Sequence, residues 1–290
     1  MHKKYVGIII VSLLILVGLF IGLVSLITPV ATSPNWDFEC HTYGHPHLTG
    51  LTAEQIASEY TKVNDAFSAQ GLPIPQHTAY PFGDYNDEVI NVTKQYRKTA
   101  RFAWAVTDTA NTYPIKDWCQ LNAVEIRSVT TWSTIQPWID DAIARKALLN
   151  IFTHKVIDPA PLYGCTPETL TNLLNYLKQK QDAGQLKVMT MAEAYNVWST
   201  ATTNPEATVV VSFDDNWRTD YTTVWPLFKA RGLAGTSYIN PSAMGGIGRW
   251  AEVKEMAGIS TPTLTKTEPV VSLLVAPLWW RKQPRTLTQV

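Results

Sequence analysis

The sequence predicts an α/β fold built on a parallel sheet, either open or closed into a barrel. Short β-branched and aromatic runs alternate with stretches of helical periodicity from residue 36 to residue 257. Strand–helix units of this length are typical of parallel sheets, because each helix crosses back over the sheet before the next strand. At 290 residues, 46% of them hydrophobic and 17% charged, the chain suits one large packed domain or two small ones.

The expected strands are short, apolar and bounded by turn residues, and Thr208–Phe213 is the clearest of them. The others are Trp36–Cys40, Phe102–Thr107, Val124–Val129, Leu148–Thr153, Lys187–Met189 and Gly235–Ile239. Helices are expected to begin at the capping box of Thr52 and at Thr166-Pro167, where Thr caps and Pro opens the first turn. Further helices are expected over 87–98, 133–146, 191–198, 222–231 and 249–257.

The N-terminus predicts a membrane anchor. Residues 6–27 form an uncharged apolar run that follows two lysines, and about 20 such residues cross a bilayer as a helix. We expect residues 1–5 to form a cytoplasmic tip and 6–27 an uncleaved signal anchor, with a cleaved signal peptide as the alternative. Residues 28–35 then form a linker to a globular part outside the cytoplasm, and residues 261–290 form an irregular tail.

Charge and cysteine content exclude several classes. Lys and Arg number 24, as do Asp and Glu, and no long basic run occurs, so a nucleic-acid partner is not expected. Three cysteines are too few for a disulfide framework. We expect Cys40 to lie in the core, and a bridge between Cys119 and Cys165 is left open.

Candidate functional residues follow the expected strands. His41 and His45 follow the first strand, and neutral imidazole is a common ligand for zinc-like metals. Asp214 and Asp215 end the strongest strand, and His154 ends another. Because the carboxyl ends of parallel strands meet at one edge of the sheet, we expect these side chains to form one site.

These residues resemble the motifs of the polysaccharide deacetylases, the NodB-homology domain of carbohydrate esterase family 4. The histidine motif, H-[ST]-x-x-H-P, is matched in full, and the T-F-D-D-G motif appears with Ser first and Asn last. The matching segments are His41-Thr42-Tyr43-Gly44-His45-Pro46, Ser212-Phe213-Asp214-Asp215-Asn216, Ala79-Tyr80-Pro81-Phe82-Gly83 and Ile151-Phe152-Thr153-His154. Arg127 stands near the place of the remaining motif.

The resemblance implies a seven-stranded NodB-type (β/α) barrel, with an incomplete or distorted form of it as the alternative, and a role for each residue. Asp215, His41 and His45 would hold a divalent metal, most simply Zn²⁺. Asp214 would be the general base and His154 the general acid. The turn Tyr80-Pro81-Phe82-Gly83 would bind substrate, with the Phe82 N–H on the oxyanion. The implied enzyme is a hydrolase that removes N-acetyl groups from amino sugars of a polysaccharide.

Three departures from the family pattern affect these expectations. Asn216 stands where the family has Gly and is expected to strain the turn, and Ala79 replaces an Arg that positions the base. The motif order also differs, since Asp214-Asp215 follows the other motifs. We therefore expect a deacetylase-like domain over 36–260 in permuted order, with the His motifs in 36–198 and the Asp motif in 207–260. The alternative is two incomplete domains.

Two other functions remain open from the residues alone. An inactive remnant would bind glycan without turnover. A simple metal-binding protein would rest on His41, His45 and His47, but it would leave Asp214 and His154 without a role.

Overall fold

The structure is a computed structural model that describes residues 36–103, 108–246 and 248–259. Its centre is one parallel sheet in the order β3-β2-β1-β8-β7-β5-β4, with β6 paired to β7. The strands are β1 (Trp36–Cys40), β2 (His77–Ala79), β3 (Thr99–Arg101), β4 (Val124–Glu125), β5 (Leu148–Thr153), β6 (Lys187–Val188), β7 (Thr208–Asp214) and β8 (Gly235–Ile239). This confirms the predicted α/β class.

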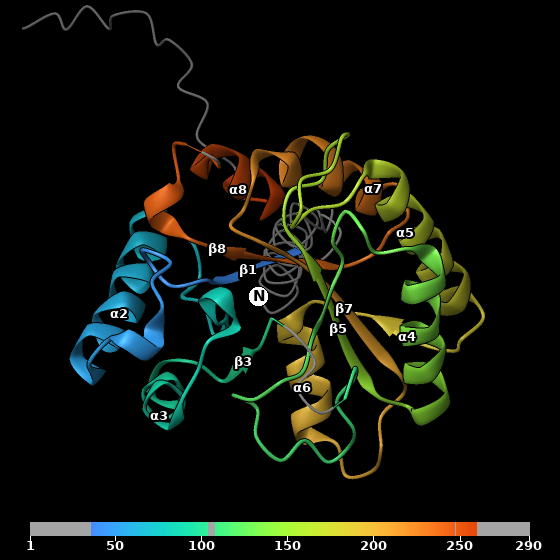
Figure 1. The fold of residues 1–290 in the computed structure, drawn as a ribbon, viewed down its shortest axis with the longest axis horizontal. Coiled ribbons are helices and arrows are strands. Elements are labelled where there is room, and N and C mark those ends of the chain that lie inside the picture. The colour runs from blue at the N-terminus through green and yellow to red at the C-terminus, as the bar shows by residue number, and fades with distance from the viewer. Residues whose placement is uncertain (1–35, 104–107, 247, 260–290) are drawn as a thin grey trace, which may run out of the picture. The chain divides into compact units, whose positions relative to one another are not determined.

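The sheet curls, consistent with an incomplete (β/α) barrel (Figure 1). Its edge strands β3 and β4 approach each other, because Arg101 of β3 forms a parallel bridge with Leu121, shortly before β4. The N–H of Phe102 donates a hydrogen bond to the carbonyl of Leu121 at 3.0 Å. The N–H of Leu121 donates one to the carbonyl of Ala100, also at 3.0 Å. The two edges are therefore joined over a short stretch.

Helices surround this sheet (Figure 1). They are α2 (Ala53–Ala69), α3 (Asp87–Tyr96), α4 (Trp132–Arg145), α5 (Pro167–Asp182), α6 (Met191–Thr200), α7 (Trp225–Lys229) and α8 (Trp250–Met256). The predicted starts are confirmed: Thr52 forms a capping box with Gln55, and Thr166 caps α5 with Pro167 in its first turn. Such caps satisfy N–H groups that have no partner within the helix.

Three elements differ from the prediction for local reasons. The strand expected over 102–107 is Thr99–Arg101 instead, and residues 104–107 lie outside the described part. The strand expected over 124–129 ends at Glu125, since Arg127 and Thr130 form a turn in which each backbone N–H finds an acceptor on the other residue. Residues 220–224 form a π-helical turn before α7, where Pro226 lacks the N–H of a regular helix.

The predicted tip, anchor and linker (1–35) and tail (261–290) lie outside the described residues. Within the described ranges, no helix has both the length and the hydrophobicity needed to cross a membrane. All three cysteines are buried and free, so the option of a Cys119–Cys165 bridge is not realised and Cys40 lies in the core as predicted.

The two faces of the sheet differ in polarity. On β1, Trp36 packs against Phe213 and Phe228 on the helix-covered face. The alternate residues Asp37 and Glu39 belong to the inner face, where successive side chains of a strand point in the opposite direction. Asp37 accepts a hydrogen bond at 3.0 Å from the N–H of Ala192 in α6, and Glu39 accepts two from the backbone of β2 and the residue before it. The sheet therefore encloses a polar interior.

This interior predicts a measurable pH effect on stability. Burial raises the pKa of Asp37 to about 6. The folded chain thus holds this proton more tightly than the unfolded chain, so the stabilisation is complete below about pH 4 and is lost as the pH rises through about 6. Asp37→Asn keeps the acceptor for Ala192 without the charge. We expect it to raise the free energy of unfolding at pH 7 by about 1–2 kcal/mol, and to change it little at pH 4.

Urea denaturation at both pH values measures this effect. The control is Asp65→Asn on the exposed face of α2, which should leave the free energy unchanged at either pH. A variant of Asp37 that is no more stable than the parent at pH 7 would contradict the prediction.

Candidate active site

The candidate site lies at the carboxyl ends of β1 and β7, which flank β8. β1 and β8 pair over five residues, from Trp36 with Gly235 to Cys40 with Ile239. β8 pairs in turn with β7 up to Asp214 with Tyr238. Since all these strands are parallel, the loops after β1 and β7 leave the sheet at the same edge. The predicted His and Asp residues are thereby brought together.

Three side chains form a cluster with the chemistry of a metal site. The Nε2 atoms of His41 and His45 lie 3.9 Å and 3.8 Å from Oδ1 of Asp215, and 3.1 Å from each other. All three ligand atoms lie within 4.8 Å of one another. Two imidazoles and a carboxylate are a donor set that suits Zn²⁺ and leaves further coordination positions open. The cluster fits a divalent metal.

The histidines are oriented for ligation by their surroundings. Nδ1 of His41 donates to the carbonyl of Ala79 at 2.9 Å, which leaves Nε2 with its lone pair toward the cluster. Burial, with the neighbouring charge of His41, lowers the pKa of His45 to about 4. His45 is thus neutral near pH 7, the form that binds metal. The loop is closed by the Thr42 hydroxyl, which accepts from the N–H of His45 at 3.1 Å.

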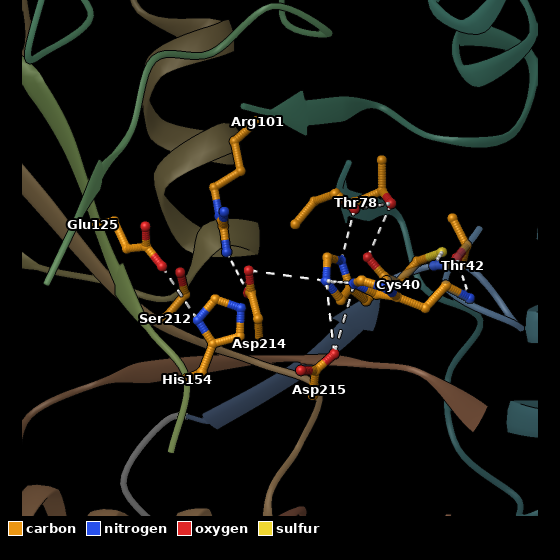
Figure 2. A network of polar contacts seen from close by, with 12 residues as sticks. Cys40, Thr42, Thr78, Arg101, Glu125, His154, Ser212, Asp214 and Asp215 are labelled. Atoms are coloured by element: carbon orange, nitrogen blue, oxygen red, sulfur yellow. Dashed lines mark hydrogen bonds and ion pairs between the residues drawn. The ribbon is translucent and has the colours of Figure 1, made fainter. Parts of the chain in front are cut away.

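Asp214, the predicted base, is 3% exposed and forms an ion pair with the buried guanidinium of Arg101 (Figure 2). Burial raises the pKa of Asp214, but Arg101 and the nearby imidazoles outweigh it, so the pKa lies below its usual value. Oδ2 of Asp214 lies 4.0 Å from Nε2 of His41. The Asp214 carboxylate therefore stays ionised beside the three candidate metal ligands, His41, His45 and Asp215.

Arg101 is the residue that the sequence reasoning missed. The family motif has Arg at the position of Ala79, and the sequence predicts that its loss leaves the base, Asp214, less well positioned. In the sheet, however, Ala79 of β2 pairs directly with Arg101 of β3. The neighbouring strand thus supplies a guanidinium at the same level of the sheet. The available signal was the alternation of Thr99 and Arg101, which places both on one face.

His154, the predicted acid, lies at the end of β5 and faces a carboxylate from β4. Its Nδ1 lies 3.5 Å from Oε1 of Glu125 (Figure 2). Oε2 of Glu125 accepts a hydrogen bond at 2.5 Å from Nε of Arg127. Glu125 is a second functional residue that sequence reasoning did not single out. Arg127, predicted to stand near the place of the remaining family motif, pairs with this carboxylate and also lines the cavity.

The turn after β7 takes Asn216 with a left-handed backbone. Asp215 and Asn216 have φ values of 69° and 51°. Asn is among the residues that tolerate this region best after Gly, so the substitution expected to strain the turn is accommodated. Asn216 packs closely on Gly248, where an added Cβ would lie 2.4 Å from the Asn216 carbonyl oxygen.

The turn Tyr80–Gly83 forms one rim of the site. Phe82 is 44% exposed with φ of 58°, and its ring contacts His45 edge-on and stacks on His47 at 3.8 Å. Tyr80 is buried, and its hydroxyl donates to the carbonyl of Cys119 at 3.0 Å. Pro81 is buried, and Gly83 has φ of 71° with no room for a Cβ beside Ala103. His47, expected to face solvent, is exposed and paired with Asp84 at 2.5 Å.

The candidate residues open into one cavity of about 1010 Å³. It is lined by the three residues of the candidate metal site and by Asp214, His154 and Phe82. The loop after β5 adds apolar lining residues, namely Ile157, Pro159, Ala160, Pro161, Leu162 and Tyr163. A cavity of this size is in the range of small-molecule and sugar-binding sites.

Comparison with known proteins supports the motif-based resemblance. Residues 23–100 match the family model described as polysaccharide deacetylase. No similar sequence was found among curated proteins. The matched segment contains His41, His45 and the turn Tyr80–Gly83, while Asp214, Asp215 and His154 lie beyond it.

Three solved structures show partial similarity. The structure of IcaB from Ammonifex degensii is 23% identical, with a TM-score of 0.35 over 39% of this chain and 48% of that one. The Streptococcus pyogenes deacetylase PplD in complex with acetate is 18% identical, with a TM-score of 0.32 over 39% and 52%. An amidohydrolase crystal structure is 10% identical, with a TM-score of 0.27 over 78% and 68%.

The chain spans about half the length of the first two proteins, and TM-scores this low add no argument about fold or activity. The family match and the motifs agree on His41, His45 and the turn Tyr80–Gly83. Over residues 23–100, which hold both candidate metal-ligating histidines, the sequence is similar to the polysaccharide deacetylase family.

Proposed function

We propose that this chain is a metal-dependent hydrolase that removes N-acetyl groups from the amino sugars of an N-acetylglucosamine-type polysaccharide outside the cytoplasm. The observation that carries the proposal is the convergence of five side chains in one cavity: His41, His45, Asp215, Asp214 and His154. The first three form a donor set for a metal, Asp214 is a base and His154 is an acid.

His41, His45 and Asp215 would hold the metal, for which Zn²⁺ is the best match. When bound, such an ion polarises the amide carbonyl and makes a water molecule more acidic at neutral pH. Asp214 is not part of this donor set. Its Oδ1 is paired with Arg101, which leaves Oδ2 to accept a proton.

Each proton transfer and hydrogen bond of the reaction would then be made by a separate residue of the chain. Asp214 accepts a proton from the attacking water as that water bonds to the acetyl carbon. The backbone N–H of Phe82 donates to the developing oxyanion. His154, whose Nδ1 lies 3.5 Å from Oε1 of Glu125, protonates the sugar nitrogen as the carbon–nitrogen bond breaks. Acetate and a free amino sugar are the products.

We also infer that residues 36–260 form a single domain in permuted order, equivalent to the seven-stranded barrel of the deacetylases. The pairing of the first described strand with the last over five residues supports this, because two incomplete domains would not share one sheet. The apolar run 6–27 would anchor this domain to the membrane.

Acetate release tests the activity. We expect the chain with added Zn²⁺ to release acetate from a tetramer of N-acetylglucosamine, and Asp214→Asn to lower kcat by at least about 10²-fold through loss of the base. The control is Asp65→Asn, the same change on an exposed helix face, which should keep full activity. Sugar binding without acetate release under any metal would favour the inactive remnant.

Metal content tests the ligand set independently of turnover. We expect His41→Gln, His45→Gln and Asp215→Asn each to reduce the bound zinc measured by elemental analysis after dialysis, since each removes a donor. His47→Gln is the matched control, because His47 lies close by but pairs with Asp84. Zinc loss in the His47 variant, with retention in the Asp215 variant, would instead support a three-histidine binding protein.

Arg101→Met tests the ion pair with Asp214. Removal of the cation leaves a buried carboxylate without compensation, so we expect a loss of about 3–5 kcal/mol in stability. We also expect a fall in kcat of at least about tenfold at a temperature where circular dichroism shows the variant folded. Arg101→Lys should recover part of the activity. Arg231→Met, which removes a half-buried arginine that bonds Asn175 outside the site, should keep the kcat of the parent. Unchanged kcat in a folded Arg101→Met chain would exclude a role for this pair in catalysis.

A further inference from the structure

We propose that the glycan bound in the cavity carries an anionic group, a carboxylate or a phosphate, which is recognised by Lys155 on the β5 side of the site. The inference rests on the proposed function, since it names the substrate class of the same cavity. It starts from the charges of the cavity and their partners.

Each acid that lines the cavity already has a positive or metal-binding partner. Asp214 is paired with Arg101, and Glu125 is paired with Arg127 at 2.5 Å. Asp215 faces the imidazoles of His41 and His45, the other two candidate metal ligands. These acids therefore leave no counter-charge for another cation in the cavity.

Lys155 is that other cation. It lines the cavity immediately after His154, and among the described residues no carboxylate oxygen lies within 4.0 Å of its ammonium. The ammonium lies over an aromatic face instead, with Nζ 5.0 Å from the ring centroid of Trp217. A half-buried ammonium without an acid, beside a substrate cavity, favours an anionic ligand.

The position of Lys155 is fixed from both sides. Its carbonyl accepts a hydrogen bond at 3.3 Å from the N–H of Cys165, and the next residue, Val156, forms a parallel bridge with Cys165. The N–H of Val156 donates to the hydroxyl of Thr219 at 3.3 Å. Trp217 then holds the ammonium beside the turn that carries Asp215. A pre-ordered cation loses less entropy when it binds a ligand.

The surroundings suit a charged sugar better than a small free anion. Tyr163, Leu162 and Phe82 line the same cavity as Lys155 and are 52%, 55% and 44% exposed. Apolar and aromatic side chains pack on the faces of sugar rings, while the ammonium pairs with the charged substituent. Lysine binds carboxylate and phosphate alike as a point charge, so the shared chemistry is the negative charge.

The test measures kcat/KM of the zinc-loaded chain on three N-acetylated oligomers of equal length. They are the neutral N-acetylglucosamine tetramer, a tetramer that alternates N-acetylglucosamine with a uronic acid, and a phosphodiester-linked N-acetylglucosamine oligomer. We expect kcat/KM to be about fivefold higher for at least one anionic oligomer, mainly through a lower KM. The arm that shows the preference identifies carboxylate or phosphate as the group recognised.

Two substitutions assign the preference to Lys155. Lys155→Met should bring the ratio of kcat/KM between anionic and neutral oligomers to about one, and Lys155→Arg should largely keep it. Lys187→Met is the control, since Lys187 lies on β6 outside this cavity and pairs with Glu206. Equal kcat/KM values for all oligomers, or a preference that survives Lys155→Met, would overturn the inference.

Calorimetry separates this inference from the proposed function. Binding of the same oligomers to the Asp214→Asn chain requires no turnover. If no oligomer is hydrolysed but the anionic ones bind more tightly, and Lys155→Met abolishes that difference, the proposed activity fails while the role of Lys155 stands. If all oligomers bind and react equally, the activity stands and the role of Lys155 fails.

Discussion

The ladder between β1 and β8 is the contact on which the rest of the site depends. These strands come from opposite ends of the described chain, yet their residues pair one to one from Trp36 with Gly235 to Cys40 with Ile239. A slip of one residue would turn His41 to the helix-covered face and move it away from Asp215. The ladder is reinforced from the side by Trp36, whose indole N–H donates to the hydroxyl of Ser237 at 3.2 Å. Site geometry is thus set by backbone register.

Within the sheet, the buried cation Arg101 stabilises the polar interior by pairing with Asp214. The guanidinium of Arg101 lies between the rings of Phe152 and Tyr238, with centroid distances of 4.1 Å and 4.7 Å, and it binds Asp214. Buried charges are costly unless paired and hydrogen-bonded, so neither partner is stable there alone. The aromatic faces add favourable cation–π contacts on both sides. One arginine thus serves the core and the site together.

Local signals in the sequence predicted much of this molecule, and non-local ones were missed. Helix starts at Thr52 and Thr166 follow from neighbouring residues, and the motif around His41 and His45 is contiguous in the chain. Arg101 and Glu125 act through strand pairing: Arg101 pairs with Ala79, and Glu125 pairs with Phe152. Spacing along the chain does not reveal such partners, because register is decided by the whole sheet. For the same reason the motif order alone left open whether the Asp and His residues share one site.

The pairing of β1 with β8 also sets the order in which the protein can assemble. Trp36 and Ser237 are separated by 201 positions, so β1 has left the ribosome long before its partner strand has been made. Until then β1 is an edge strand with unpaired backbone groups, which is a state prone to intermolecular pairing. Closing so long a loop also slows folding. The charged and polar residues of β1, Asp37 and Glu39, reduce this hazard, since charge on an exposed edge opposes aggregation. The same acids that burden the finished interior therefore protect the nascent chain.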